Sequence, residues 1–240
     1  MTRTHPACCG PFDFAWPLPA PLPGVRWVAC RFDPARLDPA AFRQSDVPMP
    51  ASIERSVPKR QAEYLAGRLC AREALLPLLG RPAIPTIGND RAPVWPHGVC
   101  GSITHGSGLA AAVVGPSRAW RSLGLDVEED LPDDRAERLA GEILVPAELE
   151  RLAGLPAAER ARQVTLTFSL KESLFKALYP LVRQRFYFEA AEVVACAGGR
   201  ARLRLLADLD GEWRAGCELD GLYAAHGAHL LSVVAVAARG

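Results

Sequence analysis

The stretch from Thr165 to Pro180, TLTFSLKESLFKALYP, constrains the fold of this chain more than any other. Its apolar residues recur with the period of an α-helix and would cover most of the helix surface. They are Leu166, Leu170, Leu174 and Leu178, with Phe168, Phe175 and Tyr179 in a second strip. The remaining polar seam consists of Ser169, Glu172, Ser173 and Lys176. Because so wide an apolar surface must be buried on two sides, the seam is predicted to line a cleft.

The lysines of the chain favour the same interpretation. There are three, Lys59, Lys171 and Lys176, and arginine supplies the other strongly basic side chains. Two of the three fall close together on this helix, which indicates that a compact, rotatable ammonium is needed there. The alternative is a solvated surface ion pair, because Glu172 and Lys176 are spaced i, i+4 in the favourable order. The helix alone leaves both interpretations open.

Length and composition limit the class of protein. A chain of 240 residues suffices for one large domain or two small ones. The net charge of +1 gives no global attraction to nucleic acid or to an anionic membrane. Seven cysteines without a C-x-x-C spacing favour reduced thiols over a disulfide framework or a zinc site. Prolines interrupt the N-terminal segment, and no run is long enough to span a membrane. We therefore expect a cytoplasmic protein with no membrane span and no nucleic-acid partner.

The first half of the chain is predicted to contain a strand, a long helix and a hairpin. The predicted elements are a proline-rich arm over residues 1–24, a strand over 24–33, a proline-rich loop over 34–50, a helix over 58–80 and a hairpin over 101–115. Arg68 and Arg72 lie opposite the apolar face of the helix, where a solvated surface is the commoner arrangement. His105 ends a strand beside a glycine turn and is placed to donate to an anion, although a structural histidine is the alternative. Ser102 and His105 lack the acid partner and the nucleophile-elbow pattern of a hydrolase.

The second half begins with a predicted strand, RSLGLDVEED, that carries two carboxylates. Asp126 and Glu128 alternate with apolar residues and therefore share one face of the strand. Such carboxylates repel each other unless a cation lies between them, and oxygen ligands of this kind suit Mg²⁺, especially when phosphates complete its shell. The alternative is a solvated strand end that runs into the acidic turn EEDLPDD. This stretch alone does not exclude the alternative.

The rest of the second half is predicted to contain helices and strands, as the first half does. Two short amphipathic helices are predicted over residues 133–144 and 146–156, before the long helix already described. A basic loop and a hairpin that turns at Gly198 and Gly199 follow, and then further strands. Each half thus contains a long helix and several strands, which suggests a weak internal duplication.

Three motifs, taken in order, resemble those of a known family. They are G-S-I-T-H at 101–105, G-L-D-V-E at 124–128 and F-S-L-K-E-S-L-F-K at 168–176. Together they resemble the 4'-phosphopantetheinyl transferase superfamily, whose members carry S-x-S/T-H, G-I-D-I-E and W-x-x-K-E-A/S-x-x-K at comparable separations. The chain length and the stretch KRQAEYLAGRLCARE are similar to the full-length type represented by enterobactin synthetase component D and the surfactin-activating enzyme. The clear departure is Phe168, which stands where the family usually has a tryptophan and loses the indole donor.

The resemblance implies an architecture and a division of the chain. The implied fold is α+β, with two pseudo-symmetric halves that each pack a small antiparallel sheet with a long helix. Beyond the arm, residues 25–118 would form the half that contacts coenzyme A phosphates. Residues 119–240 would form the half with the metal site and the catalytic helix. The resemblance places the active site between the halves of a monomer.

The resemblance also implies a metal site and catalytic residues. Asp126, Glu128 and Glu172 match the family's Mg²⁺ ligands. Glu172 would in addition take a proton, directly or through a metal-bound water. Lys176 matches the second lysine of its motif and would hold a phosphate oxygen near the pyrophosphate. Lys171 would stabilise the transition state or the leaving group.

Coenzyme A itself would be held by basic and polar residues of the first half. Thr104 and His105 match the phosphate contacts of the family, and Arg91 matches a basic residue that precedes a proline. Arg55, before the first long helix, is our match for a residue that reaches the 3'-phosphate. Lys176 would join them at the pyrophosphate.

The implied reaction moves the 4'-phosphopantetheine group of coenzyme A to a serine of an apo acyl or peptidyl carrier protein and releases adenosine 3',5'-bisphosphate. The nucleophile then belongs to the partner, which accounts for a chain without a recognisable nucleophile of its own. Carrier proteins are commonly acidic, so Arg183 and Arg185 are candidate contacts, with solvated loop arginines as the alternative. The pathway stays open between fatty acid, polyketide, peptide and siderophore synthesis.

Two other classes of function remain possible at this stage. One is a different Mg²⁺-dependent nucleotide phosphotransferase or pyrophosphatase, which would need no carrier protein. The other is a non-catalytic module that binds carrier protein or coenzyme A, with Phe168 as the mark of a decayed site. The intact set of carboxylates and lysines argues against decay.

Overall fold

The computed structural model describes residues 5–239 and divides them into two compact units. Unit 1 comprises residues 5–16 and 23–119, and unit 2 comprises residues 17–22 and 120–239. The sequence placed the division at residues 118 and 119. Residues 1–4 of the predicted proline-rich arm lie outside the described residues.

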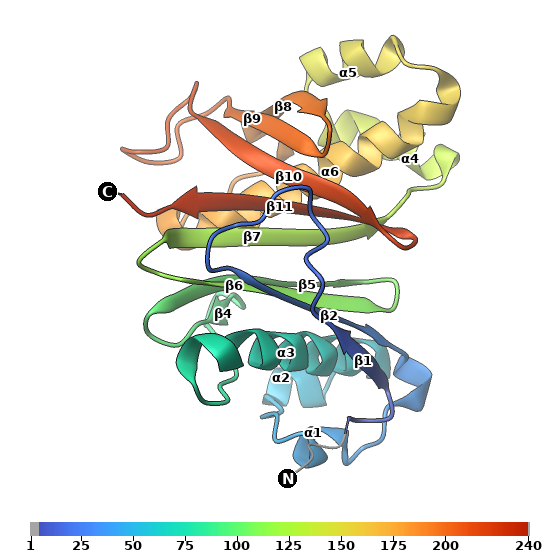
Figure 1. Cartoon of the computed structure of the whole chain (residues 1–240). Coiled ribbons are helices and arrows are strands. Elements are labelled where there is room, and N and C mark those ends of the chain that lie inside the picture. Colours follow the sequence, from blue (N-terminus) through green and yellow to red (C-terminus); the bar gives the residue numbers. More distant parts are fainter. Residues whose placement is uncertain (1–4, 240) are drawn as a thin grey trace. The chain divides into compact units, whose positions relative to one another are not determined.

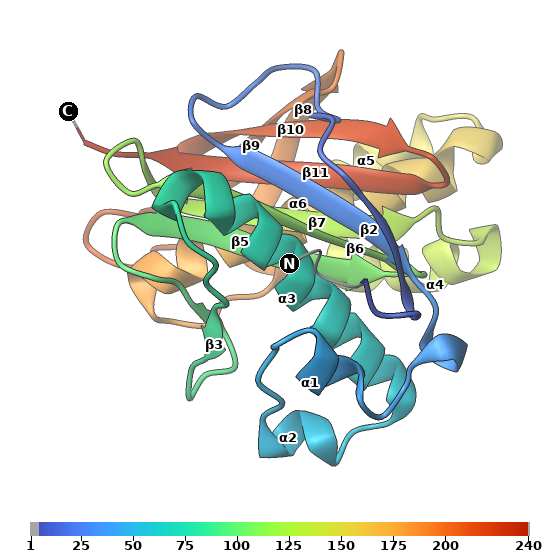
Figure 2. The same ribbon diagram turned by 60° about the horizontal axis from the view of Figure 1, so that its bottom comes forward.

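Unit 1 contains a four-stranded antiparallel sheet in the order β1-β2-β6-β5. Its strands are β1 (Cys9–Asp13), β2 (Arg26–Phe32), β5 (Val99–Gly106) and β6 (Leu109–Pro116). Helix α3 (Pro58–Leu79) packs across one face of this sheet (Figures 1 and 2). Two further strands, β3 (Thr86–Ile87) and β4 (Pro93–Val94), form a separate hairpin. The sequence did not predict β1, an edge strand whose register shifts around Pro11, where a proline is tolerated.

Both faces of α3 are covered. The sheet covers one, and the segment with η1 (Pro34–Arg36), α1 (Ala41–Gln44) and α2 (Ala51–Glu54) lies beside the other (Figure 2). The prediction that Arg68 and Arg72 are solvated is therefore wrong, because they are only 6% and 7% exposed. Arg72 donates to the carbonyl oxygen of Ser45 at 2.6 Å, and Phe42 stacks on Tyr64.

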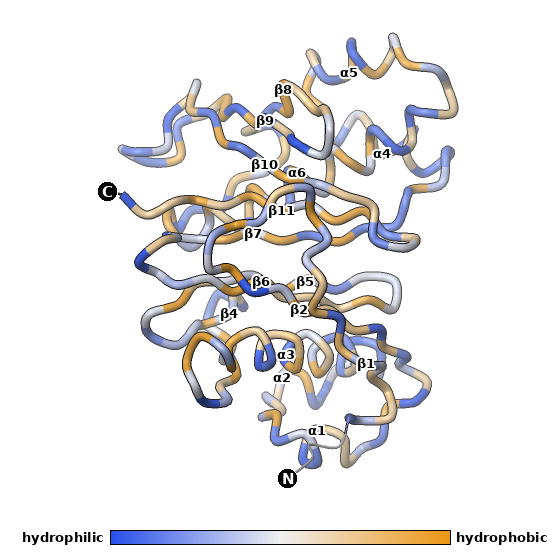
Figure 3. Tube along the Cα trace, in the orientation of Figure 1, coloured by the Kyte–Doolittle hydropathy of each residue, from blue (hydrophilic) through white to orange (hydrophobic). Residues whose placement is uncertain are grey.

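Unit 2 contains a five-stranded antiparallel sheet in the order β7-β11-β10-β9-β8. The strands are β7 (Trp120–Glu129), β8 (Ala191–Ala197), β9 (Arg200–Leu205), β10 (Glu218–His226) and β11 (His229–Ala237). Helix α6 (Ala157–Val182) packs against β7 and β11. Helices α4 (Asp133–Ile143) and α5 (Pro146–Ala153) pack beside α6, and the short helix η2 (Phe188–Ala190) precedes β8. Along α4 and α5 the hydropathy colours alternate, as expected for amphipathic helices (Figure 3). The predicted α+β class, with a long helix on an antiparallel sheet in each unit, is confirmed.

The central part of α6 is buried largely as its apolar pattern predicts. Leu170, Leu174 and Leu178 are fully buried in the core of unit 2. The polar seam differs from the prediction, because Ser169 and Ser173 are also fully buried and hydrogen-bond to Ser232 of β11. Only the part of the seam that carries Glu172 and Lys176 keeps some exposure. No helix among residues 5–239 combines the length and apolar character needed to cross a membrane.

Candidate active site

A close contact between α6 and β7 builds the carboxylate site. A Cβ atom on Gly124 would overlap the carbonyl oxygen of Ser173 and lie 2.5 Å from the backbone nitrogen of Ala177. Only a residue without a side chain permits this approach of helix backbone to strand. The glycine of the G-L-D-V-E motif therefore lets α6 lie directly along the strand that carries the motif's carboxylates.

This contact brings together residues from two of the predicted motifs. Asp126 is 3% exposed, and its partner across the sheet is Ser232 of β11. The Nζ atom of Lys176 lies 2.6 Å from Oδ1 of Asp126. The sequence predicted both residues as parts of one site, and they form a charged hydrogen bond between β7 and α6.

The three carboxylates affect one another through their charge. Burial, together with the charges of Asp126 and Glu172, raises the pKa of Glu128 to about 7, although the charge of Lys176 opposes the increase. Burial also raises the pKa of Glu172, with a further increase from Asp126 that Lys176 opposes. The site therefore holds more negative charge than Lys176 neutralises, and a divalent cation would relieve the repulsion.

The donor set fits Mg²⁺ by its chemistry, because all three side chains offer carboxylate oxygens. Within residues 5–239, no three His, Cys, Asp or Glu side chains are already arranged around a common metal position. Lys176 is paired with Oδ1 of Asp126, so the carboxylates are neighbours without forming a closed cage.

The raised pKa of Glu128 predicts that the metal-free protein becomes less stable as pH rises. Its ordinary pKa is 4.5 and its folded pKa is about 7, so the folded protein holds an extra proton between these values. That contribution is complete below pH 4.5 and is lost as pH rises through about 7. We expect a loss of about 1–3 kcal/mol, seen as a fall in melting temperature in chelator, and a recovery on adding Mg²⁺ near neutral pH.

Two variants control this experiment. Glu128→Gln should remove most of the pH dependence in this range. Glu142→Gln, at an exposed position of α4, should keep it. A wild-type melting temperature that stays constant across the range, or that rises with pH in chelator, would contradict the assignment.

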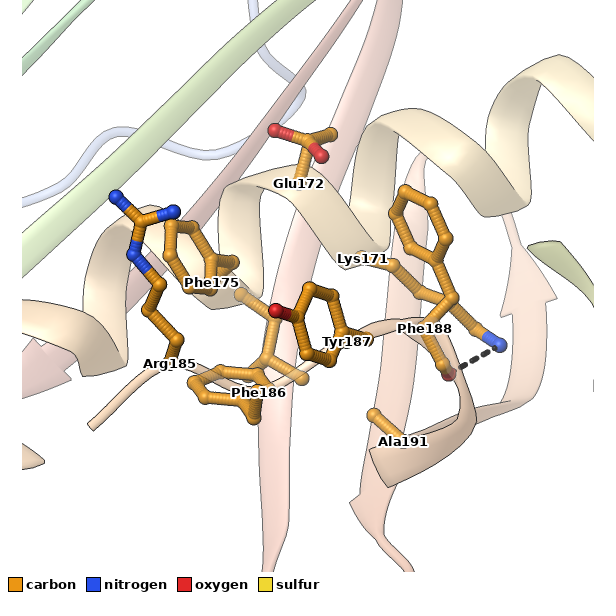
Figure 4. Close-up of a pocket in the computed structure, with 9 residues that line it drawn as sticks. Lys171, Glu172, Phe175, Arg185, Phe186, Tyr187, Phe188 and Ala191 are labelled. Atoms are coloured by element: carbon orange, nitrogen blue, oxygen red, sulfur yellow. Dashed lines mark hydrogen bonds between the residues drawn. The ribbon is translucent and has the colours of Figure 1, made fainter. Parts of the chain in front are cut away.

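Lys171 lies apart from the carboxylates, although it is adjacent to Glu172 in sequence. Its Nζ atom donates to the carbonyl oxygens of Ile143 and Phe188 and to the carboxylate of Glu148, at 2.7–3.0 Å. Figure 4 shows its side chain and that of Glu172 extending in different directions from α6. The three protons of the ammonium are thereby engaged, and the residue is 3% exposed. This geometry favours a structural role over the catalytic role inferred from the motif.

A pocket of about 200 Å³ lies beside Glu172 (Figure 4). Its lining is mostly apolar and aromatic and includes Phe175, Phe186, Tyr187 and Phe188. Tyr187 is 67% exposed at this wall. The pocket therefore offers apolar contact to an extended group whose reacting end lies at the carboxylates.

In unit 1, the hairpin and α3 place basic groups together. The guanidinium of Arg60 lies 2.6 Å from Nε2 of His105, and Glu63 lies 3.5 Å from Nδ1 of the same ring. Thr104, the other predicted contact from this motif, is buried on the opposite face of the strand, since adjacent residues alternate. Arg55 and Arg91 are exposed, at the end of α2 and in the turn of the β3–β4 hairpin.

Arg60 and Arg68 are further candidates for anion binding that the sequence motifs did not indicate. Arg68 lies two helical turns after Arg60, and its guanidinium stacks on the ring of Tyr64 at 4.6 Å. Burial lowers the pKa of Arg68, and its Nε donates to no residue within the described range. The signal was present as arginines at i and i+8 with a tyrosine between them, which places all three on one helical stripe.

Comparison with known proteins identifies the family. A model of the 4'-phosphopantetheinyl transferase N-terminal domain matches residues 49–115, and one of the 4'-phosphopantetheinyl transferase superfamily matches residues 122–234. The chain is 40% identical over 196 residues to 4'-phosphopantetheinyl transferase Svp of Streptomyces mobaraensis, covering 78% of this chain and 77% of the relative. It is 43% identical over 143 residues to enterobactin synthase component D of Escherichia coli K12, covering 58% and 66%. With 4'-phosphopantetheinyl transferase PptT of Mycobacterium tuberculosis it shares 38% identity over 145 residues, covering 59% and 61%. The chain therefore belongs to the 4'-phosphopantetheinyl transferase superfamily.

Proposed function

We propose that this protein transfers the 4'-phosphopantetheine group of coenzyme A to a serine of an apo acyl or peptidyl carrier protein, and releases adenosine 3',5'-bisphosphate. The observation that carries the proposal is the carboxylate site at the contact of β7 and α6. Asp126, Glu128 and Glu172 carry mutually repelling charge there, and Lys176 stands beside them. Such a site suits a reaction at a pyrophosphate, where positioning and charge neutralisation do most of the catalysis.

The reaction forms one phosphorus–oxygen bond and breaks another. The serine oxygen of the carrier protein attacks the pantetheine-side phosphorus, and the bond to the 5'-phosphate of the leaving nucleotide breaks. Glu172 accepts the serine proton, a role that suits a carboxyl whose pKa is raised by burial. Lys176 holds a pyrophosphate oxygen and balances charge on the leaving phosphate. Mg²⁺, held by Asp126, Glu128 and Glu172, would neutralise charge on the pyrophosphate.

We further propose that each unit binds a different part of coenzyme A. In unit 2, the aromatic pocket beside Glu172 suits the uncharged pantetheine arm. In unit 1, His105 and Arg60 form a basic pair, and Arg68 adds a buried guanidinium. These groups suit the coenzyme's phosphates, with Thr104, Arg55 and Arg91 as the contacts inferred from the motifs.

Partner choice would be set by charge near the pocket. Arg183 ends α6, and Arg185 lines the pocket beside Glu172. An acidic surface around the carrier's serine would be attracted to these side chains. We keep the predictions that the enzyme is monomeric and cytoplasmic, and the pathway stays open between fatty acid, polyketide, peptide and siderophore synthesis.

The direct test is to incubate the protein with coenzyme A, Mg²⁺ and an apo acyl carrier protein and to measure the intact mass of the carrier. We expect a gain of one phosphopantetheine group that a chelator abolishes. If the acyl carrier gains nothing, an apo peptidyl carrier is the next substrate. Failure with both carriers would overturn the proposal. Turnover of a nucleotide without any carrier would then favour a nucleotide phosphotransferase, and binding without turnover would favour a non-catalytic module.

A further inference from the structure

A buried ion pair joins α6 to the wall of the pocket beside Glu172. We propose that this pair, Glu148 and Lys171, positions the pocket wall, to whose lining Lys171 itself also contributes. The identity of the pocket's occupant, the pantetheine arm, rests on the proposed function. The positioning role itself rests on the contacts of the two side chains.

Lys171 connects three separate segments of unit 2 to α6. Its ammonium donates to the carbonyl oxygen of Ile143 at the end of α4, to Oε2 of Glu148 on α5, and to the carbonyl oxygen of Phe188 in η2. The distances are 2.8, 2.7 and 3.0 Å. A lysine suits this position because its compact, rotatable ammonium carries three protons on one atom, one for each acceptor. These three contacts explain why the chain has a lysine rather than an arginine at position 171.

Glu148 extends the network to strand β8. Besides Lys171, its carboxylate accepts from the backbone nitrogen of Val145 at 2.8 Å and from that of Val193 at 2.6 Å. Glu148 is 5% exposed, so these donors and the ammonium replace water around its charge. Arg151 of the same helix donates to the carbonyl oxygen of Val193 at 2.8 Å. The pair therefore holds the start of β8 as well as η2.

The held segment is the one that forms the pocket wall. The carbonyl oxygen of Phe188 accepts a hydrogen bond from Lys171 (Figure 4). Its ring packs against that of Phe168, with ring centroids 5.5 Å apart. Tyr187 precedes it and is exposed at the pocket. Since Phe188 and Val193 are the two points fixed by the ion pair, its loss should free the wall while the carboxylates of β7 and α6 stay in place.

The proposal predicts an effect on binding rather than on the chemical step. The double variant Lys171→Met/Glu148→Gln removes both charges, so no buried charge is left without a partner. Compared with wild type, it should bind coenzyme A about 10-fold more weakly, because a displaced wall no longer fits the pantetheine arm. Affinity for adenosine 3',5'-bisphosphate, which lacks that arm, should change by less than about 2-fold. In transfer assays, KM for coenzyme A should rise while kcat stays within about 3-fold.

Calorimetric titration of both ligands and hydrogen exchange of residues 185–193 test this directly. Amide exchange in this segment should become faster in the double variant and stay unchanged in Arg162→Met, which removes an exposed charge from the same helix. If the double variant does not fold, Lys171→Arg offers the same comparison, because a planar guanidinium should loosen the wall while the charge is kept.

Two results would overturn the proposal. One is a kcat at least about 100-fold lower with unchanged binding and exchange, which would make Lys171 a catalytic residue. The other is equal loss of affinity for both ligands. If wild-type protein transfers nothing to any carrier, the proposed function fails, but the exchange and binding comparisons still decide whether the ion pair positions the wall.

Discussion

Asp126→Asn and Glu172→Gln should each reduce transfer to a carrier protein by about 1,000-fold or more while the protein stays folded. Each substitution keeps the shape of the side chain and removes one of the charges that would bind Mg²⁺. Glu172→Gln would also remove the group that we propose accepts the serine proton. The rate of carrier modification, measured by intact mass at saturating coenzyme A and Mg²⁺, gives the result.

These variants should lose activity without losing stability. Asp126 and Glu172 both raise the pKa of Glu128, and Asp126 raises that of Glu172, so removal of one charge relieves repulsion in the metal-free protein. The melting temperature of Glu172→Gln in chelator near neutral pH should therefore equal or exceed that of wild type. Glu129→Gln, at an exposed position next to Glu128, is the matched control and should keep its activity. Transfer by Asp126→Asn within about 5-fold of wild type would remove Asp126 from the site.

Helices and strands could be predicted from the sequence where the spacing of apolar residues shows which face is buried. The leucine row of α6 and the alternation along β7 each identify a face, and glycines mark the turn of the β5–β6 hairpin. The motifs then indicated which polar residues share a site, and Asp126 and Lys176 are in contact. The burial of the other polar residues depends on which element covers which face of a helix, and no short segment of the sequence encodes that arrangement.

The errors have one physical cause. Arg68 and Arg72 were expected in solvent because only one face of α3 is apolar, yet the segment around α1 covers the second face. Ser169 and Ser173 looked like cleft residues, yet the hydroxyl of Ser232 satisfies them inside the core. Arg72, Ser169 and Ser173 are buried because segments distant in sequence supply their hydrogen-bond partners, and no local pattern reveals those segments.

The positioning role that we propose for Lys171 also depends on segments distant in sequence. Within its motif Lys171 stands beside Glu172, but successive residues of a helix point about 100° apart. Its acceptors come from Ile143, Glu148 and Phe188, which lie 17 to 28 positions away in sequence. No motif of this length could have indicated those contacts. The lysine count did indicate that an ammonium was required, without indicating its partner.

The second large effect is expected at Gly124, where an added methyl group has no space. Gly124→Ala would drive its Cβ into the backbone of α6 at Ser173 and Ala177, and a backbone cannot rotate aside as a side chain can. We expect a loss of about 3 kcal/mol or more in the free energy of unfolding, measured by urea denaturation. Any protein that folds should also transfer about 100-fold more slowly, since Glu172 and Lys176 would move away from Asp126.

Gly221→Ala is the matched control, because it also adds a methyl group to a strand of the same sheet beneath α6. The new Cβ atom would lie 3.2 Å from the side-chain methyl groups of Leu170 and Leu203, which can shift by small rotations. This variant should lose no more than about 1 kcal/mol and keep its transfer rate. Equal denaturation midpoints for Gly124→Ala and Gly221→Ala would contradict our explanation. They would mean that displacing α6 from β7 costs no more than rotating a leucine side chain. A large difference would show that the backbone contact at Gly124, rather than sheet packing in general, holds α6 against β7.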